Sequence, residues 1–192
     1  MKNLSRLFVA ILATTFAFSA NADQIVWDGN EHSYEVITNP DNGPITWDEA
    51  REMAEELGGH LVTITTWAEN QFLAWLVDSY GIGDRQRYWL GGYQDFTLSD
   101  DCEPNNCWAW VTGEEWWDNW YYGEPNNGAG GTQHYLHYWR SPGWFDDMEN
   151  RAVMDSFVVE YSVPEPGTLG LMGLGLLGLA LSRRSKMKLQ LA

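Results

Sequence analysis

The stretch TWDEAREMAEELGGHLVTI, residues 46–64, carries the start and end signals of a helix and the strand that follows it. Thr46 and Glu49 have the spacing of a capping box, in which two side chains bind free backbone N–H groups at a helix N-terminus. Apolar residues then recur at helical spacing on one face: Ala50, Met53, Ala54 and Leu57. Gly58 and Gly59 end the helix, and HLVTI predicts a short strand after it.

A second helix with the same start signal follows this strand, with Thr66 and Glu69 as its capping pair. The residues that we expect it to bury are Ala68, Phe72 and Trp75. The pattern elsewhere favours strands: HSYEVIT at residues 32–38, and YWLGGY, CWAWV, HYLHYW and AVMDSFVVEY after the helices. A strand, two helices and then short strands predict an α+β domain with a large irregular loop region.

Residues 1–22 have the parts of a secretory signal peptide: a basic start, an apolar run and Ala-Asn-Ala at 20–22, which fits a cleavage site. The apolar run is shorter than the roughly 20 residues that a membrane-spanning helix needs, which disfavours an N-terminal anchor. We therefore expect the mature chain to start at Asp23 and to form one domain over residues 23–162.

Residues 163–188 combine a Val-Pro-Glu-Pro motif, an apolar Gly/Leu run and a basic cluster. A basic cluster straight after a short apolar segment fits positive-inside orientation in a membrane. Together the three parts resemble the PEP-CTERM sorting signal of Gram-negative bacteria, which an exosortase-type enzyme processes. The resemblance implies export across the inner membrane to the cell surface or extracellular matrix, with membrane contact through this segment before processing.

The expected mature domain is strongly acidic, with 26 Asp and Glu against five Arg and no Lys between residues 23 and 162. Nucleic acid and anionic lipid bind basic faces, so a surface of this sign argues against both as partners. It suits cations, but most carboxylates of an exported protein serve only to keep it soluble. A binding site therefore has to be argued from the spacing of residues.

Cys102 and Cys107 are the two cysteines of the chain, and they lie in one polar loop, DCEPNNC. An exported protein meets an oxidising environment, so we expect a local disulfide, too short-ranged to stabilise the whole fold by much. Metal binding would need further Cys or a His pair at ligand spacing, which the neighbouring sequence lacks. The loop contains EPNN at residues 103–106, and the same four residues recur at 124–127. We interpret the residues of the first copy as a turn around its proline.

Five segments occur in a recognisable order: TWDEAREMAEELGGHLVTI, YWLGGY, WAWVTG, NWYYGEPNN and GWFDDM. Together they resemble a C-type lectin-like domain over nearly the whole mature chain. In that family Gly-His-Leu ends the first helix, and Trp-Ile-Gly-Leu, here residues 89–92, forms a core strand. The resemblance implies the C-type lectin-like fold, within the α+β class, for residues 23–162.

The resemblance also distinguishes the two EPNN copies. The family's Glu-Pro-Asn, which has a cis Glu-Pro bond, follows a Trp-x-Trp strand and an Asn-Trp-x-x-Gly lead-in, here residues 119–123. The second copy therefore takes the calcium-binding position, and the first is an inserted disulfide loop. The implied Ca²⁺ ligands are Glu124, Asn126, Gln133, Asp146 and Asp147, and a gap shifted by one would give Thr132 in place of Gln133. Those that would also contact a bound sugar are Glu124, Asn126, Asp146 and Asp147.

The implied calcium site differs from the family pattern in where its charges lie. A carboxylate is lost at Gln133 and one is gained at Asp146, so three negative charges are expected, on Glu124, Asp146 and Asp147. With the Asp147 carbonyl the protein would supply about six of calcium's six to eight oxygens, leaving positions for vicinal sugar hydroxyls. The positions where the family places acids for a second calcium ion hold Asn127 and His134.

The long-range disulfides of the family correspond here to Ala54 with Val159, and to Tyr135 with Asn150. No cysteine stands at any of the four positions. Ala54 and Val159 can pack against each other instead, and the many aromatic residues are expected to compensate for the missing crosslinks.

We therefore expect an exported, non-enzymatic module that binds calcium through the second EPN and a saccharide or exopolysaccharide through that ion. The alternative is a calcium-independent protein-interaction or structural module of the extracellular matrix. A glycosidase would need two opposed carboxylates at a defined separation, which no motif supplies. His60 and His137 read as structural, and Trp116, Trp117 and Trp139 are either sugar-stacking or packing residues.

Overall fold

The computed structural model describes residues 24–39, 43–80, 87–139, 143–151 and 154–162, together with residue 175. The predicted signal peptide lies outside these residues, and so does the predicted sorting signal apart from Gly175. In the described part of the chain, no helix is both long enough and apolar enough to cross a membrane.

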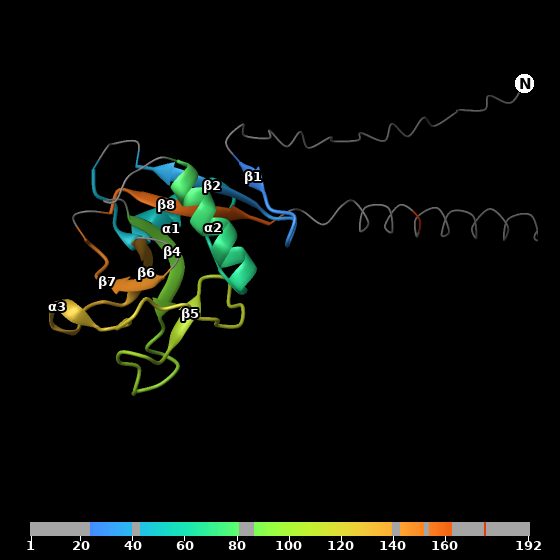
Figure 1. Cartoon of the computed structure of the whole chain (residues 1–192). Coiled ribbons are helices and arrows are strands. Elements are labelled where there is room, and N and C mark those ends of the chain that lie inside the picture. Colours follow the sequence, from blue (N-terminus) through green and yellow to red (C-terminus); the bar gives the residue numbers. More distant parts are fainter. Residues whose placement is uncertain are drawn as a thin grey trace, which may run out of the picture.

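The elements follow in the expected α+β order (Figure 1). Before and between the helices the chain forms β1 (Ile25–Val26), β2 (Ser33–Thr38), α1 (Trp47–Glu56), β3 (His60–Leu61) and α2 (Trp67–Ser79). After them it forms β4 (Arg87–Gln94), β5 (Trp108–Trp110), α3 (Gly128–Gly131), β6 (Tyr135–Trp139), β7 (Trp144–Asp147) and β8 (Ser156–Tyr161). The predicted fold class is confirmed.

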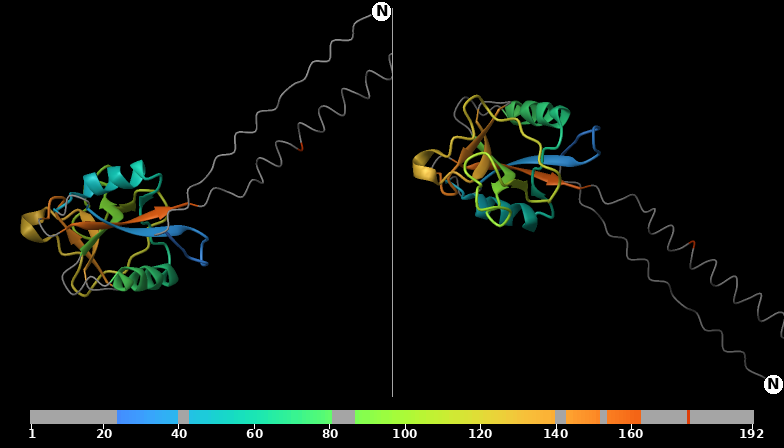
Figure 2. Two further views of the ribbon diagram at one scale, coloured as in Figure 1. Left: turned by 90° about the horizontal axis from the view of Figure 1, so that it is seen from above. Right: turned by 90° about the horizontal axis from the view of Figure 1, so that it is seen from below.

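A mixed sheet runs through the middle of the domain in the order β1-β2-β8-β4-β6-β7, with β3 paired to β8 and β5 paired to β4. Strand β8 is antiparallel to β2 and parallel to β4. The helices α1 and α2 lie on opposite sides of this sheet (Figure 2). The β6–β7 pair places Tyr135 opposite Asp147, so the end of β7 lies beside the loop that leads into β6.

Helix α1 begins with the predicted capping box. The Thr46 hydroxyl accepts the Glu49 N–H at 3.1 Å, and the Glu49 carboxylate accepts the Thr46 N–H at 2.9 Å. The residues that α1 buries completely or nearly so are Trp47, Ala50 and Ala54. Leu57 is 45% exposed, because the helix ends one residue before it.

The expected buried face of α2 is wrong. Ala68 is exposed and Trp75 is 56% exposed, while Phe72 is half-buried. The residues that α2 buries are Glu69, Asn70, Leu73, Ala74, Leu76 and Val77. Two of these are polar and are hydrogen-bonded inside the protein. A search for apolar residues at helical spacing therefore selects the wrong face of the helix as the buried one.

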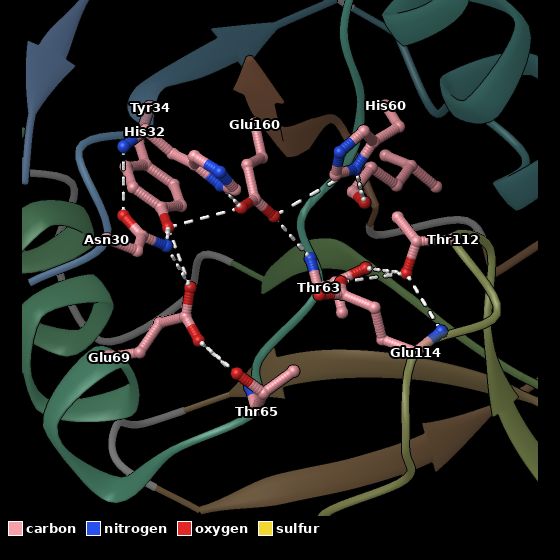
Figure 3. Close-up of polar contacts among 11 residues, drawn as sticks. Asn30, His32, Tyr34, His60, Thr63, Thr65, Glu69, Thr112, Glu114 and Glu160 are labelled. Atoms are coloured by element: carbon pink, nitrogen blue, oxygen red, sulfur yellow. Dashed lines mark hydrogen bonds and ion pairs between the residues drawn. The ribbon is translucent and has the colours of Figure 1, made fainter. Parts of the chain in front are cut away.

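The first of these buried polar residues joins distant elements, as Figure 3 shows. The Glu69 carboxylate accepts the Tyr34 hydroxyl at 2.7 Å and the Thr65 N–H at 2.9 Å. On β8 the equally buried Glu160 carboxylate accepts the Thr63 N–H at 2.9 Å. Burial raises the pKa of Glu69, and the hydrogen bond from Tyr34 opposes that rise. The two carboxylates thus connect α2 and β8 to the strand β2 and to the segment that leads into α2.

Apolar packing accounts for the missing long-range crosslinks. Ala54 and Val159 are fully buried in the same core cluster, where the family resemblance implies a disulfide. The largest fully buried side chains include Trp89, Trp110 and Trp144. Buried rings of this size remove much apolar surface from water, which stabilises the fold without a covalent link.

Candidate functional site

The lead-in segment holds the second EPNN loop, residues 124–127, against β7. The Trp144 N–H donates to the Asn119 carbonyl at 3.0 Å, and the Tyr121 N–H donates to the Trp144 carbonyl at 2.9 Å. Gly123 then turns the chain at a φ of 90°, a conformation that favours glycine. The EPNN loop therefore lies beside the residues of β7 that follow Trp144.

Two carboxylates face each other in this loop. Asp146 is 3% exposed, and its carboxylate accepts the N–H groups of Asn126 at 3.1 Å and Asn127 at 2.7 Å. The Glu124 carboxylate accepts the Asn126 side-chain amide at 2.6 Å. Burial, followed by the neighbouring Asp146 carboxylate, raises the pKa of Glu124 to about 8. At neutral pH the carboxyl group of Glu124 is therefore mostly protonated unless a cation binds beside it.

Gln133 brings a further oxygen to the same place. Its Oε1 is buried and has no hydrogen-bond partner among the described residues, while its Nε2 donates to the Asp147 carboxylate at 3.3 Å. A Cβ added at Gly128 would lie 2.5 Å from Gln133 Oε1 and 2.8 Å from Asn126 Oδ1. Both amide oxygens therefore lie close to the Gly128 backbone, where any side chain would clash with them. A buried carbonyl oxygen without a donor is unfavourable by itself, and it is a ligand that calcium accepts.

Asp147 points elsewhere, because side chains alternate between the two faces of a strand. Its Oδ2 lies 3.2 Å from Arg87 Nη1 and 3.4 Å from Arg151 Nε. It also lies 3.5 Å from His137 Nε2, but burial lowers the pKa of His137 to about 4, so that ring is neutral. The charge of Asp147 is therefore matched by arginines on the opposite face from Asp146.

The expected count of three negative charges on one ion stays a prediction, and in the structure Asp147 is paired with arginines. Asp147 reaches the loop through the Gln133 amide, and the carboxylates that face each other are Glu124 and Asp146. Within the described ranges, no three His, Cys, Asp or Glu side chains gather in a way that could hold a metal ion. Sequence reasoning missed Arg87, although the two-residue period of a strand could have separated Asp146 from Asp147.

The predicted disulfide between Cys102 and Cys107 is present, with an S–S distance of 2.04 Å. Hydrogen bonds from a buried glutamine also hold the loop that this disulfide closes. The Gln94 side-chain amide donates to the carbonyls of Cys102, Pro104 and Asn106 at 3.1, 3.2 and 3.1 Å. This donor, from the end of β4, fixes the first EPNN copy.

The first EPNN copy forms the expected turn and also contacts the second copy. Its Glu103 carboxylate accepts a hydrogen bond from the Asn127 side-chain amide and lies 3.1 Å from His134 Nδ1. Residues that the family resemblance assigns to the second calcium position therefore bind the first copy instead. The two copies meet, and both Glu-Pro bonds, at 103–104 and 124–125, are cis.

Aromatic residues around the loop separate into packing and exposed side chains. Trp116 and Trp117 are half-buried and pack on Trp144, with ring centroids 5.9 and 5.4 Å away. Trp139 is half-buried against Phe145. Tyr122, two residues before Glu124, is 97% exposed. The sequence did not indicate that the most exposed ring beside the loop is this tyrosine and not a tryptophan.

These features define a C-type lectin domain, and comparison with known proteins agrees. The Lectin C-type domain family matches residues 43–151, which is more than half of the chain. The PEP-CTERM protein-sorting motif, a signal for export in Gram-negative bacteria, matches residues 162–184. The chain belongs to the C-type lectin domain family.

Curated relatives match part of the chain at about 30% identity. The chain is 29% identical to ladderlectin of Oncorhynchus mykiss over 62% of its own length and 58% of the relative. It is 30% identical to C-type lectin domain family 6 member A of Homo sapiens over 51% and 42%. The chain spans about half the length of the curated relatives that it matches.

Two solved structures illustrate the range of the fold. The cow CD23 carbohydrate-recognition domain, described in the presence of a GlcNAc2Man3 oligosaccharide, has a TM-score of 0.58 and 20% identity, with 76% of this chain and 98% of that chain covered. A calcium-independent type II antifreeze protein has a TM-score of 0.56 and 16% identity, with 76% and 96% covered. At these identities the likeness shows the fold alone.

Proposed function

We propose that this protein is an exported lectin-like module that binds a calcium ion through the second EPN loop and a saccharide through that ion. The side chains that would supply oxygens are Glu124, Asn126, Gln133 and Asp146. The observation that carries the proposal is the buried Gln133 Oε1, which has no donor in the described part of the chain. This oxygen and Asn126 Oδ1 both lie close to the Gly128 backbone.

The charges of the loop support a divalent cation. Glu124 and Asp146 face each other, and like charges at this separation oppose each other unless a proton or a cation lies between them. Two carboxylates match the charge of one calcium ion. Asp147 is already paired with Arg87 and would act by accepting the Gln133 amide N–H, which keeps Oε1 turned toward the site.

The proposed ligands leave room on the ion for a sugar. Calcium takes six to eight oxygens, so four side chains leave positions that two adjacent sugar hydroxyls can occupy. Tyr122 offers an exposed ring two residues from Glu124, against which a sugar face can pack. An exopolysaccharide of the extracellular matrix is the ligand class that best fits a lectin domain with a PEP-CTERM motif, which an exosortase-type enzyme would process.

A calcium-independent interaction module is the second candidate. One solved structure with this fold is itself described as calcium-independent, and the Asn126 amide already binds Glu124 directly. This candidate would leave Gln133 Oε1 buried without a donor, which costs about 1 to 3 kcal/mol. The calcium-binding proposal gives that oxygen a partner, and we therefore favour it.

Calorimetric titration of the purified protein with CaCl2 tests the proposal. We expect one calcium ion per chain and a rise in melting temperature with added calcium, since the ion binds only the folded state. A panel of monosaccharides, titrated with calcium and then with EDTA, should give binding only when calcium is present. A protein that gives no heat and no melting shift with calcium would rule the proposal out.

A further inference from the structure

A pocket of about 340 Å³ opens where α1 meets β4 and β6. Three aromatic rings from these three elements line it: Trp47 of α1, Tyr93 of β4 and Tyr135 of β6. None of the proposed calcium ligands lines this pocket. Its volume lies within the range of small-molecule sites, which is about 300 to 1,000 Å³.

The rings form a concave wall. The centroid of Trp47 lies 4.9 Å from that of Tyr135 and 5.6 Å from that of Tyr93. The planes are inclined by 37° and 45°, so neither tyrosine is stacked flat on the tryptophan. The Trp47 indole N–H donates to the Leu90 carbonyl at 2.8 Å. With its polar atom used in the core, Trp47 is fixed but only 4% exposed, so the accessible ring surface of the pocket comes mainly from the half-buried Tyr93 and Tyr135.

The mouth of the pocket is acidic and already holds one cation. Asp48 and Glu55 line it together with Arg51, which lies between them on α1. Arg51 Nε lies 3.8 Å from Asp48 Oδ1, and its Nη1 lies 3.1 Å from Glu55 Oε1. The guanidinium carbon lies 6.0 Å from the centroid of Trp47, at the outer limit of a cation–π contact. A cation of the protein itself thus sits loosely over the ring.

The excess of negative charge favours a second cation there. Two carboxylates at the mouth outnumber the single guanidinium, and the domain as a whole carries 26 acidic residues against five arginines. Tyr135 stands where the family resemblance implies a cysteine, so one wall of the pocket comes from a departure from the family pattern.

We propose that the aromatic pocket of Trp47, Tyr93 and Tyr135 binds an alkylammonium group, such as a quaternary ammonium. The electron-rich ring faces attract the cation, and this attraction is stronger in a partly desolvated pocket than on an open surface. Asp48 and Glu55 supply the opposite charge at the mouth. The ligand displaces the Arg51 guanidinium from its place over Trp47, and the site does not depend on calcium.

The test compares choline with 3,3-dimethylbutan-1-ol, which has the same shape without the charge. Each is titrated calorimetrically into the purified full-length protein with EDTA present, and methyl glucoside is titrated in parallel. We expect choline to bind at least tenfold more tightly than the neutral alcohol. Equal binding of the two, no binding of choline, or binding of methyl glucoside alone would overturn the proposal, the last result identifying a neutral-sugar pocket.

Variants locate the site and separate it from the calcium loop. Tyr93→Leu should weaken choline binding at least fivefold, whereas Arg51→Gln should strengthen it at least threefold because it removes the competing cation. Trp67→Leu is the matched control, since Trp67 is the first residue of α2 as Trp47 is of α1 but is 54% exposed. Weaker binding in Arg51→Gln, or equal losses in Tyr93→Leu and Trp67→Leu, would contradict the assignment. Calcium affinity measured on the same variants should not change, so each site is tested independently of the other.

Discussion

The two EPNN copies have the same four residues and the same cis Glu-Pro bond but meet opposite partners. In the first copy, Glu103 faces donors, the amide of Asn127 and the ring of His134. In the second copy, Glu124 faces another carboxylate, Asp146. The first copy is thus satisfied by the protein, whereas the second holds two facing carboxyl groups, of which Glu124 has a raised pKa.

The same contrast appears in the two glutamines that accompany the copies. Gln94 donates to three carbonyls of the first loop, and its Oε1 lies 3.0 Å from His134 Nδ1. Gln133 leaves its Oε1 buried without a donor among the described residues. A motif of four residues therefore does not define a site. What distinguishes a site is the partner that a distant strand brings to it.

The largest expected effect separates the two glutamates. Glu124→Gln removes one of two facing carboxylates and should weaken calcium binding at least about 100-fold, which is about 2.7 kcal/mol. Glu103→Gln removes a carboxylate already paired with donors and should change the affinity less than about threefold. Calorimetric titration of both variants with CaCl2 gives the two ratios. Similar losses in the two variants would mean that position in the fold does not distinguish the copies.

The two glutamines should respond in opposite ways. Gln94→Leu removes hydrogen bonds to three loop carbonyls, although the Cys102 carbonyl keeps the Asn106 N–H and the Pro104 carbonyl keeps the Trp108 indole N–H. It should lower the free energy of unfolding by about 1 to 3 kcal/mol, with calcium affinity retained. Gln133→Leu removes an oxygen that has no donor, so without calcium its stability should stay within about 1 kcal/mol of the wild type. Its calcium binding should be lost. Denaturant unfolding with and without calcium measures both effects, and a calcium response retained by Gln133→Leu would exclude Gln133 as a ligand.

The smallest expected effect concerns the disulfide of the first loop. Replacing Cys102 and Cys107 with Ser opens a short loop, for which chain entropy gives about 2 kcal/mol at most. Gln94 still holds the loop carbonyls, so thermal unfolding should remain cooperative with a modestly lower melting temperature. Loss of the cooperative transition would show that this loop is part of the core.

Features set by neighbouring residues could be predicted from the sequence. The capping box of Thr46 and Glu49 and the disulfide depend on residues a few positions apart, and both are present. The buried face of α2 could not be found by the same means. Glu69 is buried because Tyr34, from a strand 35 positions away, donates to it, and no local pattern contains that partner.

The candidate site likewise has some features that the sequence predicts and others that it does not. The EPN position and its lead-in followed from motif order, and the loop indeed lies against β7. The direction of Asp147 did not follow, because its partner Arg87 lies 60 positions earlier and is brought there by the sheet. The contact between the two EPNN copies depends on tertiary structure in the same way.

A double-mutant cycle on Gln133 and Asp146 tests most directly whether the second copy holds a calcium ion. Asp146→Asn leaves one facing carboxylate and should weaken binding strongly, and Gln133→Glu then restores a second. In the wild type, two carboxylates already match the charge of the ion. The third carboxylate that Gln133→Glu adds there should therefore increase the calcium affinity only slightly.

The measurement is the calcium affinity of the wild type, both single variants and the double variant by calorimetry. We predict that Gln133→Glu strengthens calcium binding at least tenfold more in the Asp146→Asn background than in the wild type, a coupling of at least about 1.4 kcal/mol. An equal effect of Gln133→Glu in the two backgrounds would show that residues 133 and 146 do not share an ion, and would contradict the calcium site.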